Sequence, residues 1–372
     1  ADGFVLDGEA KDIDLTYRDQ DTPVVTFDSE WQNSRQKAKV IVTKKEKLSD
    51  RVLEGGVFAL CAKEDIKNAD GDVLVKADTI IEQKATDKDG KIFFTADLPV
   101  GGSFYVKEVK APAGFVTTEE VKEFTFEYAG ADAPEVTFEH TFENEATIFE
   151  ITKSDLTTGE ELPGAKLEVT DQDGTVVDEW TSGTEPHIIK ELEVGKEYTL
   201  TETLPADGYV TAESITFTVE NTAEVQKVEM KDDVTKVEIS KTDISGKELP
   251  GAKMTVLDKD GNAVESWTST DKPHYMEKLP IGDYILREET APEGYLIAED
   301  VEFSVKDTGE IQKVSMKDEK KPSETPQTPQ EPSKPTDTPK TGDDSNIRLW
   351  LLLAGLALCG TGGSLLLLKK KK

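Results

Sequence analysis

The stretch ITKSDLTTGEELPGAKLEVTDQDG at residues 151–174 decides the fold, because it returns as ISKTDISGKELPGAKMTVLDKDG at residues 239–261. Further along each copy, YTLTETLPADGYVTAESITFTVE at residues 198–220 is matched by YILREETAPEGYLIAEDVEFSVK at residues 284–306. The equivalent lysines Lys153 and Lys241 stand 88 residues apart. A tandem repeat of this length predicts a row of similar small domains.

An earlier and longer copy runs from residue 37 to 145, with VTKKE at residues 42–46 and FYVKEVKAPAGF at residues 104–115. The chain also opens on GFVLDGEAKDIDLTY at residues 3–17, which has the landmarks of GFVTTEEVKEFTFEY at residues 114–128. We therefore expect residues 1–36 to be the C-terminal part of a truncated domain, preceded by further chain. Complete domains are expected at residues 37–145, 146–233 and 234–320.

Apolar and polar residues alternate within each copy, as at Ile215, Phe217 and Val219. This period of two is typical of half-buried strands, and no long helical period occurs in the repeats. We expect Asp173-Gly174 and Asp260-Gly261 to close two-residue hairpins. About seven short strands per copy predict an all-β fold of tandem β-sandwich domains, with an immunoglobulin-like or prealbumin-like (transthyretin-like) topology.

The composition excludes some functions. The 372 residues include 76 acidic and 44 basic side chains, and a formal net charge of -32 repels nucleic acid and anionic lipid. We expect no nucleic-acid partner. The two cysteines, Cys61 and Cys359, lie in different parts of the chain and provide no disulfide framework. Small β domains outside the cell would then need some other staple.

After Lys320 the composition changes to KPSETPQTPQEPSKPTDTPK, which predicts an extended Pro-rich linker at residues 321–337. Residues 349–368 form an uncharged, mostly apolar run that is long enough for one C-terminal transmembrane helix. Four lysines follow, at residues 369–372. By itself this arrangement fits a plain membrane anchor with its basic end inside the cell.

Between linker and apolar run stand five residues that sharpen this interpretation: Thr338, Pro339, Lys340, Thr341 and Gly342. Together with the helix and the basic tail, they resemble the LPxTG cell-wall sorting signal of Gram-positive surface proteins, with Thr338 in place of the usual Leu. The resemblance implies that a sortase attacks the carbonyl of Thr341 and transfers it to peptidoglycan. Residues 338–372 would then be a sorting signal, and the chain would be in the membrane only before sorting.

Each complete copy also carries a recurring trio of polar residues on the parity of its core. A lysine in the first strand follows inward-facing apolar residues, a glutamate comes four residues after an aromatic, and an Asn or Asp closes the last strand. The trios are Lys44, Glu108 and Asn144; Lys153, Glu202 and Asp232; Lys241, Glu288 and Asp318. A lysine that faces a core needs an explanation, and a snorkelling path to water or a buried ion pair with the glutamate would supply one.

The trios and the patterns YTLTETLPADGY and YILREETAPEGY resemble the Cna B-type or SpaA-like domains of surface adhesins and pilins, which have a prealbumin-like fold. The resemblance implies that each lysine bonds spontaneously to the Asn or Asp side chain while the glutamate assists. The isopeptide pairs would be Lys44–Asn144, Lys153–Asp232 and Lys241–Asp318. Asn33 would be the acceptor of the truncated domain.

The other motifs give weaker evidence of a function. Asp171, Asp173 and Gly174 open like a calcium loop, but Ser182 stands where such a loop needs Glu. The three histidines have no metal-ligand spacing, and surface positions are expected for His187 and His274; the remaining one is His140. Trp180 and Trp267 are expected to be packing residues. We expect no metal, no cofactor and no enzyme acting on an external substrate.

The combined prediction is a secreted, sortase-anchored cell-wall protein that acts as a rigid stalk, as in an adhesin. Its partners would be sortase, peptidoglycan and, through an upstream region, a host or extracellular-matrix protein. A basal or accessory pilin subunit is the chief alternative, although no lysine motif resembling YPK occurs. A spacer of a surface enzyme whose catalytic domain lies upstream is the second alternative.

Overall fold

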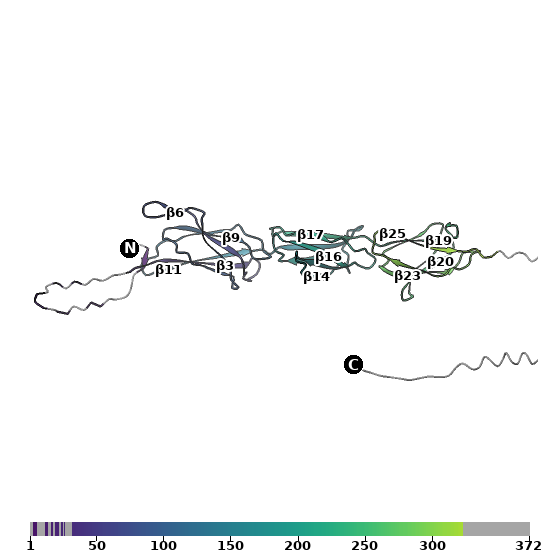
Figure 1. Ribbon diagram of the computed structural model, residues 1–372, viewed down its shortest axis with the longest axis horizontal. Coiled ribbons are helices and arrows are strands. Elements are labelled where there is room, and N and C mark those ends of the chain that lie inside the picture. Colours follow the sequence, from purple (N-terminus) through teal and green to yellow (C-terminus); the bar gives the residue numbers. More distant parts are fainter. Residues whose placement is uncertain are drawn as a thin grey trace, which may run out of the picture. The chain divides into compact units, whose positions relative to one another are not determined.

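The structure is a computed structural model that describes residues 3–5, 12–13, 16–17, 19–21, 24, 26 and 32–322. All regular elements in these residues are β-strands (Figure 1). The prediction of an all-β fold is therefore confirmed for this part of the chain. Among the same residues, no helix is long and apolar enough to span a membrane. The expected linker beyond Pro322, the sorting signal and the transmembrane helix at residues 349–368 lie outside the described residues.

The described residues up to Lys321 belong to one unit, and its second domain shows the basic plan. Two sheets have the strand orders β15-β12-β18 and β14-β13-β16-β17. Their strands are β12 (Ile148–Asp155), β13 (Lys166–Thr170), β14 (Val176–Thr181), β15 (His187–Lys190), β16 (Glu197–Leu204), β17 (Ile215–Thr218) and β18 (Val225–Asp232). The seven strands agree with the number expected from the alternating pattern.

The third domain repeats this plan strand for strand. Its sheets have the orders β22-β19-β25 and β21-β20-β23-β24. The strands are β19 (Lys236–Asp243), β20 (Lys253–Asp258), β21 (Ala263–Thr268), β22 (His274–Glu277), β23 (Gly282–Thr290), β24 (Val301–Val305) and β25 (Ile311–Asp318). Similar sequences thus build the same topology in both domains.

The first domain has the same two sheets, β11-β3-β8 and β10-β9-β4-β7. Their strands are β3 (Lys37–Glu46), β4 (Val57–Ala62), β7 (Ile80–Ala85), β8 (Lys91–Phe94), β9 (Ser103–Lys110), β10 (Val121–Thr125) and β11 (Glu135–Asn144). A small hairpin of β5 (Ile66–Lys67) and β6 (Val73–Val75) is inserted between β4 and β7. This insertion accounts for part of the greater length of the first copy. A further pair, β1 (Phe4–Val5) and β2 (Ser34–Arg35), precedes the domain.

The first and last strands of every domain are parallel neighbours in one sheet. Lys44 of β3 pairs with Phe142 of β11. Lys153 pairs with Met230 in the second domain, and Lys241 pairs with Met316 in the third. Parallel neighbours require a long connection, and here the rest of the domain supplies it. The two strands where the chain enters and leaves the domain therefore lie side by side.

The core of each domain lies between its two sheets, as alternating strands require. In the second domain it includes the buried side chains of Ile151, Leu167, Leu200 and Met230. Equivalent apolar clusters fill the other two domains. Successive side chains of a strand point to opposite faces, so residues that share the parity of Ile151 point into this core.

The prediction of two-residue hairpins was wrong. The Asp171 amide donates to the Thr175 carbonyl and closes the hairpin. The loop between these two residues therefore has three residues, 172–174. The Asp171 carboxylate accepts hydrogen bonds from the amides of Asp173 and Thr175, and Gly174 has φ +79°. A left-handed glycine at the end of a three-residue loop is the second common hairpin solution. The loop at Asp258 uses the same contacts, with Gly261 in the left-handed region.

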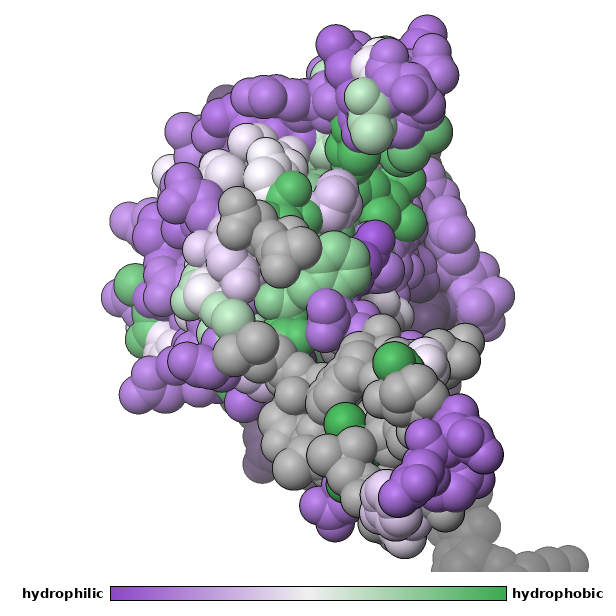
Figure 2. Space-filling view, turned by 90° about the vertical axis from the view of Figure 1, so that its left-hand side faces the viewer, coloured by the Kyte–Doolittle hydropathy of each residue, from purple (hydrophilic) through white to green (hydrophobic). Residues whose placement is uncertain are grey.

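The surface agrees with the acidic composition. Figure 2 shows a face that is mainly hydrophilic, with apolar residues gathered over a smaller part of it. The large apolar side chains exposed in the first domain include Val73 and Leu74 of the inserted hairpin. Elsewhere in the described residues, the exposed apolar side chains are spread among charged ones, as on an ordinary solvated β-sandwich.

Candidate functional site

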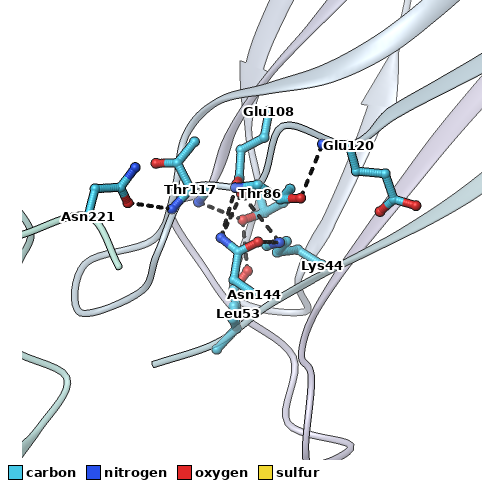
Figure 3. A network of polar contacts seen from close by, with 10 residues as sticks. Lys44, Leu53, Thr86, Glu108, Thr117, Glu120, Asn144 and Asn221 are labelled. Atoms are coloured by element: carbon cyan, nitrogen blue, oxygen red, sulfur yellow. Dashed lines mark hydrogen bonds and ion pairs between the residues drawn. The ribbon is translucent and has the colours of Figure 1, made fainter. Parts of the chain in front are cut away.

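The first domain brings its predicted trio together inside the sandwich (Figure 3). The Lys44 ammonium nitrogen contacts the side-chain oxygen of Asn144 and lies 3.3 Å from Oε1 of Glu108. The Asn144 amide nitrogen donates to both carboxylate oxygens of Glu108, at 3.0 Å each. The side chains of Lys44 and Glu108 are both 0% exposed, which excludes a snorkelling path for this lysine.

The second and third domains contain the same arrangement with Asp in place of Asn. Nζ of Lys153 contacts Oδ1 of Asp232 and lies 2.8 Å from Oε1 of Glu202. The third domain has the matching contacts of Lys241 with Asp318 and, at 2.9 Å, with Oε1 of Glu288. All of these side chains are buried.

The backbone explains why the lysine meets the acceptor. Lys153 is opposite Met230, and Asp232 lies two residues further along β18, on the same face of the sheet. The burial pattern of β18 alternates, with Met230 and Asp232 buried and Lys231 exposed. The first and third domains repeat this offset, so parallel pairing places each acceptor diagonally next to its lysine.

The glutamate reaches the same point from the opposite sheet. Glu202 on β16 pairs with the core residue Leu167, and the register shifts immediately beyond this pair. The same shift stands next to Glu108 on β9 and next to Glu288 on β23. A β-bulge re-aims the side chains beside it and recurs near functional sites. Each glutamate is thereby directed across the core towards the lysine.

Burial favours the neutral forms of these groups. It lowers the pKa of the Lys44 ammonium, while the neighbouring Glu108 carboxylate acts in the opposite direction. Burial raises the pKa of Asp232 to about 7, against the hydrogen bond and charge of Lys153. The pKa of Asp318 is raised for the same reason. Burial thus favours the uncharged amine of Lys44 and the uncharged acids of Asp232 and Asp318.

In the second and third domains, one acceptor oxygen of each cluster is left without a partner. Within the described residues, Oδ2 of Asp232 is buried and has no hydrogen bond, whereas Oε1 of Glu202 faces Lys153. The same holds for Oδ2 of Asp318 beside Lys241. Buried polar atoms without a hydrogen bond are costly and uncommon in native proteins. The second and third clusters are therefore not fully satisfied salt bridges.

One set of contacts was missed by the sequence reasoning. The main-chain amide of Thr118 donates to Oε2 of Glu108 at 2.8 Å, and those of Ala212 and Ala298 donate to Glu202 and Glu288 at 2.6 Å and 2.7 Å. Because these donors belong to the backbone, no side-chain type marks them. The only available signal was the constant spacing of ten residues between glutamate and donor.

The remaining residues singled out in the sequence lie outside the three clusters. His187 and His274 stack on Trp180 and Trp267 at 4.1 Å and stand at the starts of β15 and β22. Both histidines are half-buried, so the expected surface positions are confirmed only in part. Trp180 and Trp267 pack against the cores, as expected. His140 is half-buried on β11, Cys61 is buried and free, and Asn33 is exposed before β2. Among the described residues, no group of three or more His, Cys, Asp or Glu is placed to hold a metal ion.

Comparisons with known proteins agree with this domain plan. The family model described as SpaA, prealbumin-like fold domain, matches residues 38–141, 147–234 and 235–320. The chain is similar to the TIE protein of Bacillus anthracis, with 28% identity, a TM-score of 0.42 and coverage of 77% of this chain. The match covers 52% of that protein, so this chain spans about half its length.

Two pilins are more distant in sequence. The chain is similar to a streptococcal ancillary pilin and to BcpA, the major pilin subunit of Bacillus cereus. Each comparison has 15% identity and a TM-score of 0.33, and covers 77% of this chain and 100% of the pilin. No curated protein sequence matches the chain.

Proposed function

The chain belongs to the SpaA family of prealbumin-like fold domains, and we propose that it is a cell-surface stalk whose domains lock themselves with isopeptide bonds. The observation that carries the proposal is the buried lysine that contacts an Asn or Asp side chain beside a glutamate, in all three domains. The domains act as structural links, and each would react once, during its own maturation.

The proposed reaction in the first domain starts from the neutral Lys44 amine. Its lone pair attacks Cγ of Asn144, and the new N–Cγ bond replaces the bond from Cγ to the amide nitrogen. One proton from Lys44 passes through Glu108 to the departing nitrogen, which leaves as ammonia. Glu108 suits this transfer because its carboxylate lies close to both the amine and the Asn144 amide.

The second and third domains would release water instead. The Lys153 amine attacks Cγ of the protonated Asp232, the bond from Cγ to the acid hydroxyl breaks, and one lysine proton leaves with that hydroxyl. A carboxylate anion is a poor electrophile, so the raised pKa of Asp232 favours the reaction. Glu202 again lies within reach of the lysine to move the proton.

The bonds would change how the stalk bears load. In the second domain, force enters at Ile148 of β12 and leaves at Asp232 of β18. A Lys153–Asp232 bond would carry this force directly, so residues 154–231 would lie outside the load path. The closed segment spans 79 positions, for which loop-closure entropy gives about 4–5 kcal/mol of stabilisation. Such a bond would substitute for disulfides in domains exposed to shear and proteases.

Intact-mass measurement tests the cross-links. A purified chain spanning residues 38–320 should be lighter than its sequence mass by one ammonia and two waters. Replacement of one assisting glutamate, for example Glu202→Ala, should abolish the mass loss of its own domain and leave the losses of the other two domains unchanged. A sequence mass without any deficit would reject the cross-links and leave the trios as buried polar clusters.

We further propose that the sorting signal, Thr338–Gly342, attaches the stalk to peptidoglycan through a sortase, and that residues 1–36 end another domain. Support for the latter is the pairing of Phe4 with Arg35, which has the same spacing as the bridge of Phe115 with Ala146. A Thr341→Ala chain expressed in a sortase-bearing host should stay out of the wall fraction. A single wall-linked band would favour the stalk, whereas a detergent-resistant ladder would favour a pilin.

A further inference from the structure

In the first and second domains, the loop that holds the assisting glutamate has two adjacent amides with different partners. In the second domain, the Ala212 amide donates to Glu202 at 2.6 Å. The amide of the preceding residue, Thr211, donates to Oδ1 of Asp307 at 2.9 Å, and Asp307 belongs to the third domain. One short segment therefore connects the reactive cluster of one domain to the next domain along the chain.

The joint between the first and second domains is built in the same way. The Thr118 amide donates to Glu108, and the Thr117 amide donates to Oδ1 of Asn221 in the second domain at 3.0 Å. Figure 3 shows Asn221 reaching Thr117 beside the Lys44 cluster. Asn221 and Asp307 lie in equivalent loops after β17 and β24. Two independent joints thus place a side-chain acceptor at the same position.

Close backbone packing holds these joints in place. A Cβ atom on Gly208 would lie 2.4 Å from the Lys278 carbonyl oxygen, and one on Gly114 would lie 2.6 Å from that of Glu191. The Thr235 hydroxyl, at the boundary, donates to the Leu279 carbonyl at 2.6 Å, and its amide donates to Gly208 at 3.0 Å. The loop that carries Thr211 is therefore clamped from the side of the third domain.

The third domain has the loop without the clamp. Ala298 donates to Glu288 at 2.7 Å, as in the other domains. Within the described part of the chain, no atom lies within 4 Å of a Cβ built on Gly294, and Ile297, equivalent to Thr211, is 59% exposed. The third domain therefore serves as an internal control for the first and second domains, in which the next domain contacts this loop.

We propose that Asn221 and Asp307 are positioning residues that act across the joints, so that a folded domain completes the reactive site of the domain before it. This inference rests on the proposed cross-linking. Because adjacent amides of an extended segment point to opposite sides, fixing Thr211 on Asp307 aims the Ala212 amide at Glu202. The Glu202 carboxylate is then held with Oε1 towards Lys153. Cross-linking of the third domain does not need this help.

The test uses the whole chain, made in a brief cell-free synthesis pulse, so that the cross-links form while they are being followed. Samples are quenched at intervals and digested, and mass spectrometry follows the three cross-linked peptide pairs separately. We expect Asp307→Ala to slow formation of the Lys153–Asp232 bond about fivefold, which corresponds to loss of one ordinary hydrogen bond. The Lys241–Asp318 bond should form at an unchanged rate, which also shows that the third domain has folded.

Two further variants separate positioning from a general structural effect. Asp307→Asn keeps an acceptor oxygen and should restore the rate in the second domain. Asn221→Ala should slow only the Lys44–Asn144 bond. Equal rates in Asp307→Ala and the unsubstituted chain would overturn the inference while leaving the cross-links in place. Absence of linked peptides from the unsubstituted chain would overturn both the inference and the proposed function.

Discussion

Nζ of Lys153 contacts Oδ1 of Asp232, although 79 positions separate the two residues in the sequence. The contact exists because β12 and β18 are parallel neighbours. Lys153 lies opposite Met230, and Asp232 follows two residues later on β18, on the same face of the sheet. The residues that begin and end the domain are thus joined at a single buried point. Changes at this point should affect the domain as a whole.

Replacement of Glu202 by Gln should block the reaction while keeping the shape of the side chain. An amide cannot exchange the proton that a carboxyl group moves between amine and leaving group. After correction for the substitution, the mass of Glu202→Gln should exceed that of the unsubstituted chain by one water. Glu197→Gln, an exposed change on the same strand, should keep the full deficit. A full deficit in Glu202→Gln would show that the glutamate is dispensable.

Replacement of Asn144 by Asp should change the leaving group of the first domain. The second and third domains already place Asp at this position, beside the same lysine and glutamate types. The domain should therefore still react, but lose water instead of ammonia. Loss of ammonia from Asn and loss of water from Asp leave the same amide bond, so the linked Asn144→Asp chain should have the mass of the linked unsubstituted chain. An unlinked Lys44 peptide pair of Asn144→Asp would be heavier by one water, which high-resolution mass spectrometry detects. An unlinked Asn144→Asp domain would mean that the first cluster cannot hold a neutral acid.

Removal of the third cross-link should weaken that domain strongly. The Lys241–Asp318 bond would close a segment of 77 positions, so Lys241→Met should lower the free energy of unfolding by about 4–5 kcal/mol. Urea unfolding, followed by protease sensitivity of the third domain, measures the change. Lys247→Met, at an exposed site, provides the control. Equal unfolding midpoints for the two variants would contradict a covalent contribution.

A second domain that lacks its cross-link should become more stable as the pH is lowered, because Asp232 is then protonated. Its folded pKa, raised by burial to about 7, exceeds the ordinary value of 3.8, so folding favours the protonated acid. This contribution is fully present below the ordinary pKa and is lost as pH rises through the folded one. In a Glu202→Gln background, unfolding free energies between about pH 4 and pH 7 should fall more steeply than in the same background with Asp232→Asn. Identical slopes would contradict the raised pKa.

Replacement of Gly208 by Ala should loosen the joint between the second and third domains. The residue has φ +83°, and the new Cβ would clash with the Lys278 carbonyl. Gly294→Ala is the matched control, because its φ of +86° carries a similar backbone strain but its surroundings are open. Protease cleavage between residues 205 and 212 should accelerate in Gly208→Ala and stay unchanged in Gly294→Ala. Similar cleavage in both variants would mean that the joint tolerates the clash.

Much of the fold could be predicted because its signals are local in the sequence. Alternation of apolar residues marks strands, and the repeat of Lys153 at Lys241 marks two equivalent domains. The parity of Ile151 and Lys153 also placed the lysine on the core side of β12 before its partners were known. The hairpins were misjudged because an Asp side chain competes for backbone amides and lengthens the loop by one residue.

The sequence by itself determined which residues face the interiors of the domains, since side-chain direction in a strand follows from a period of two. Only the tertiary structure decided which of them meet. Contacts such as Lys153 with Asp232 depend on which strands become neighbours and in what register. The amides of Thr118 and Ala212, and the reach of Asp307 across a joint, depend on backbone geometry that no residue type encodes. A main-chain donor is present at almost every position, and folding alone selects the few that matter.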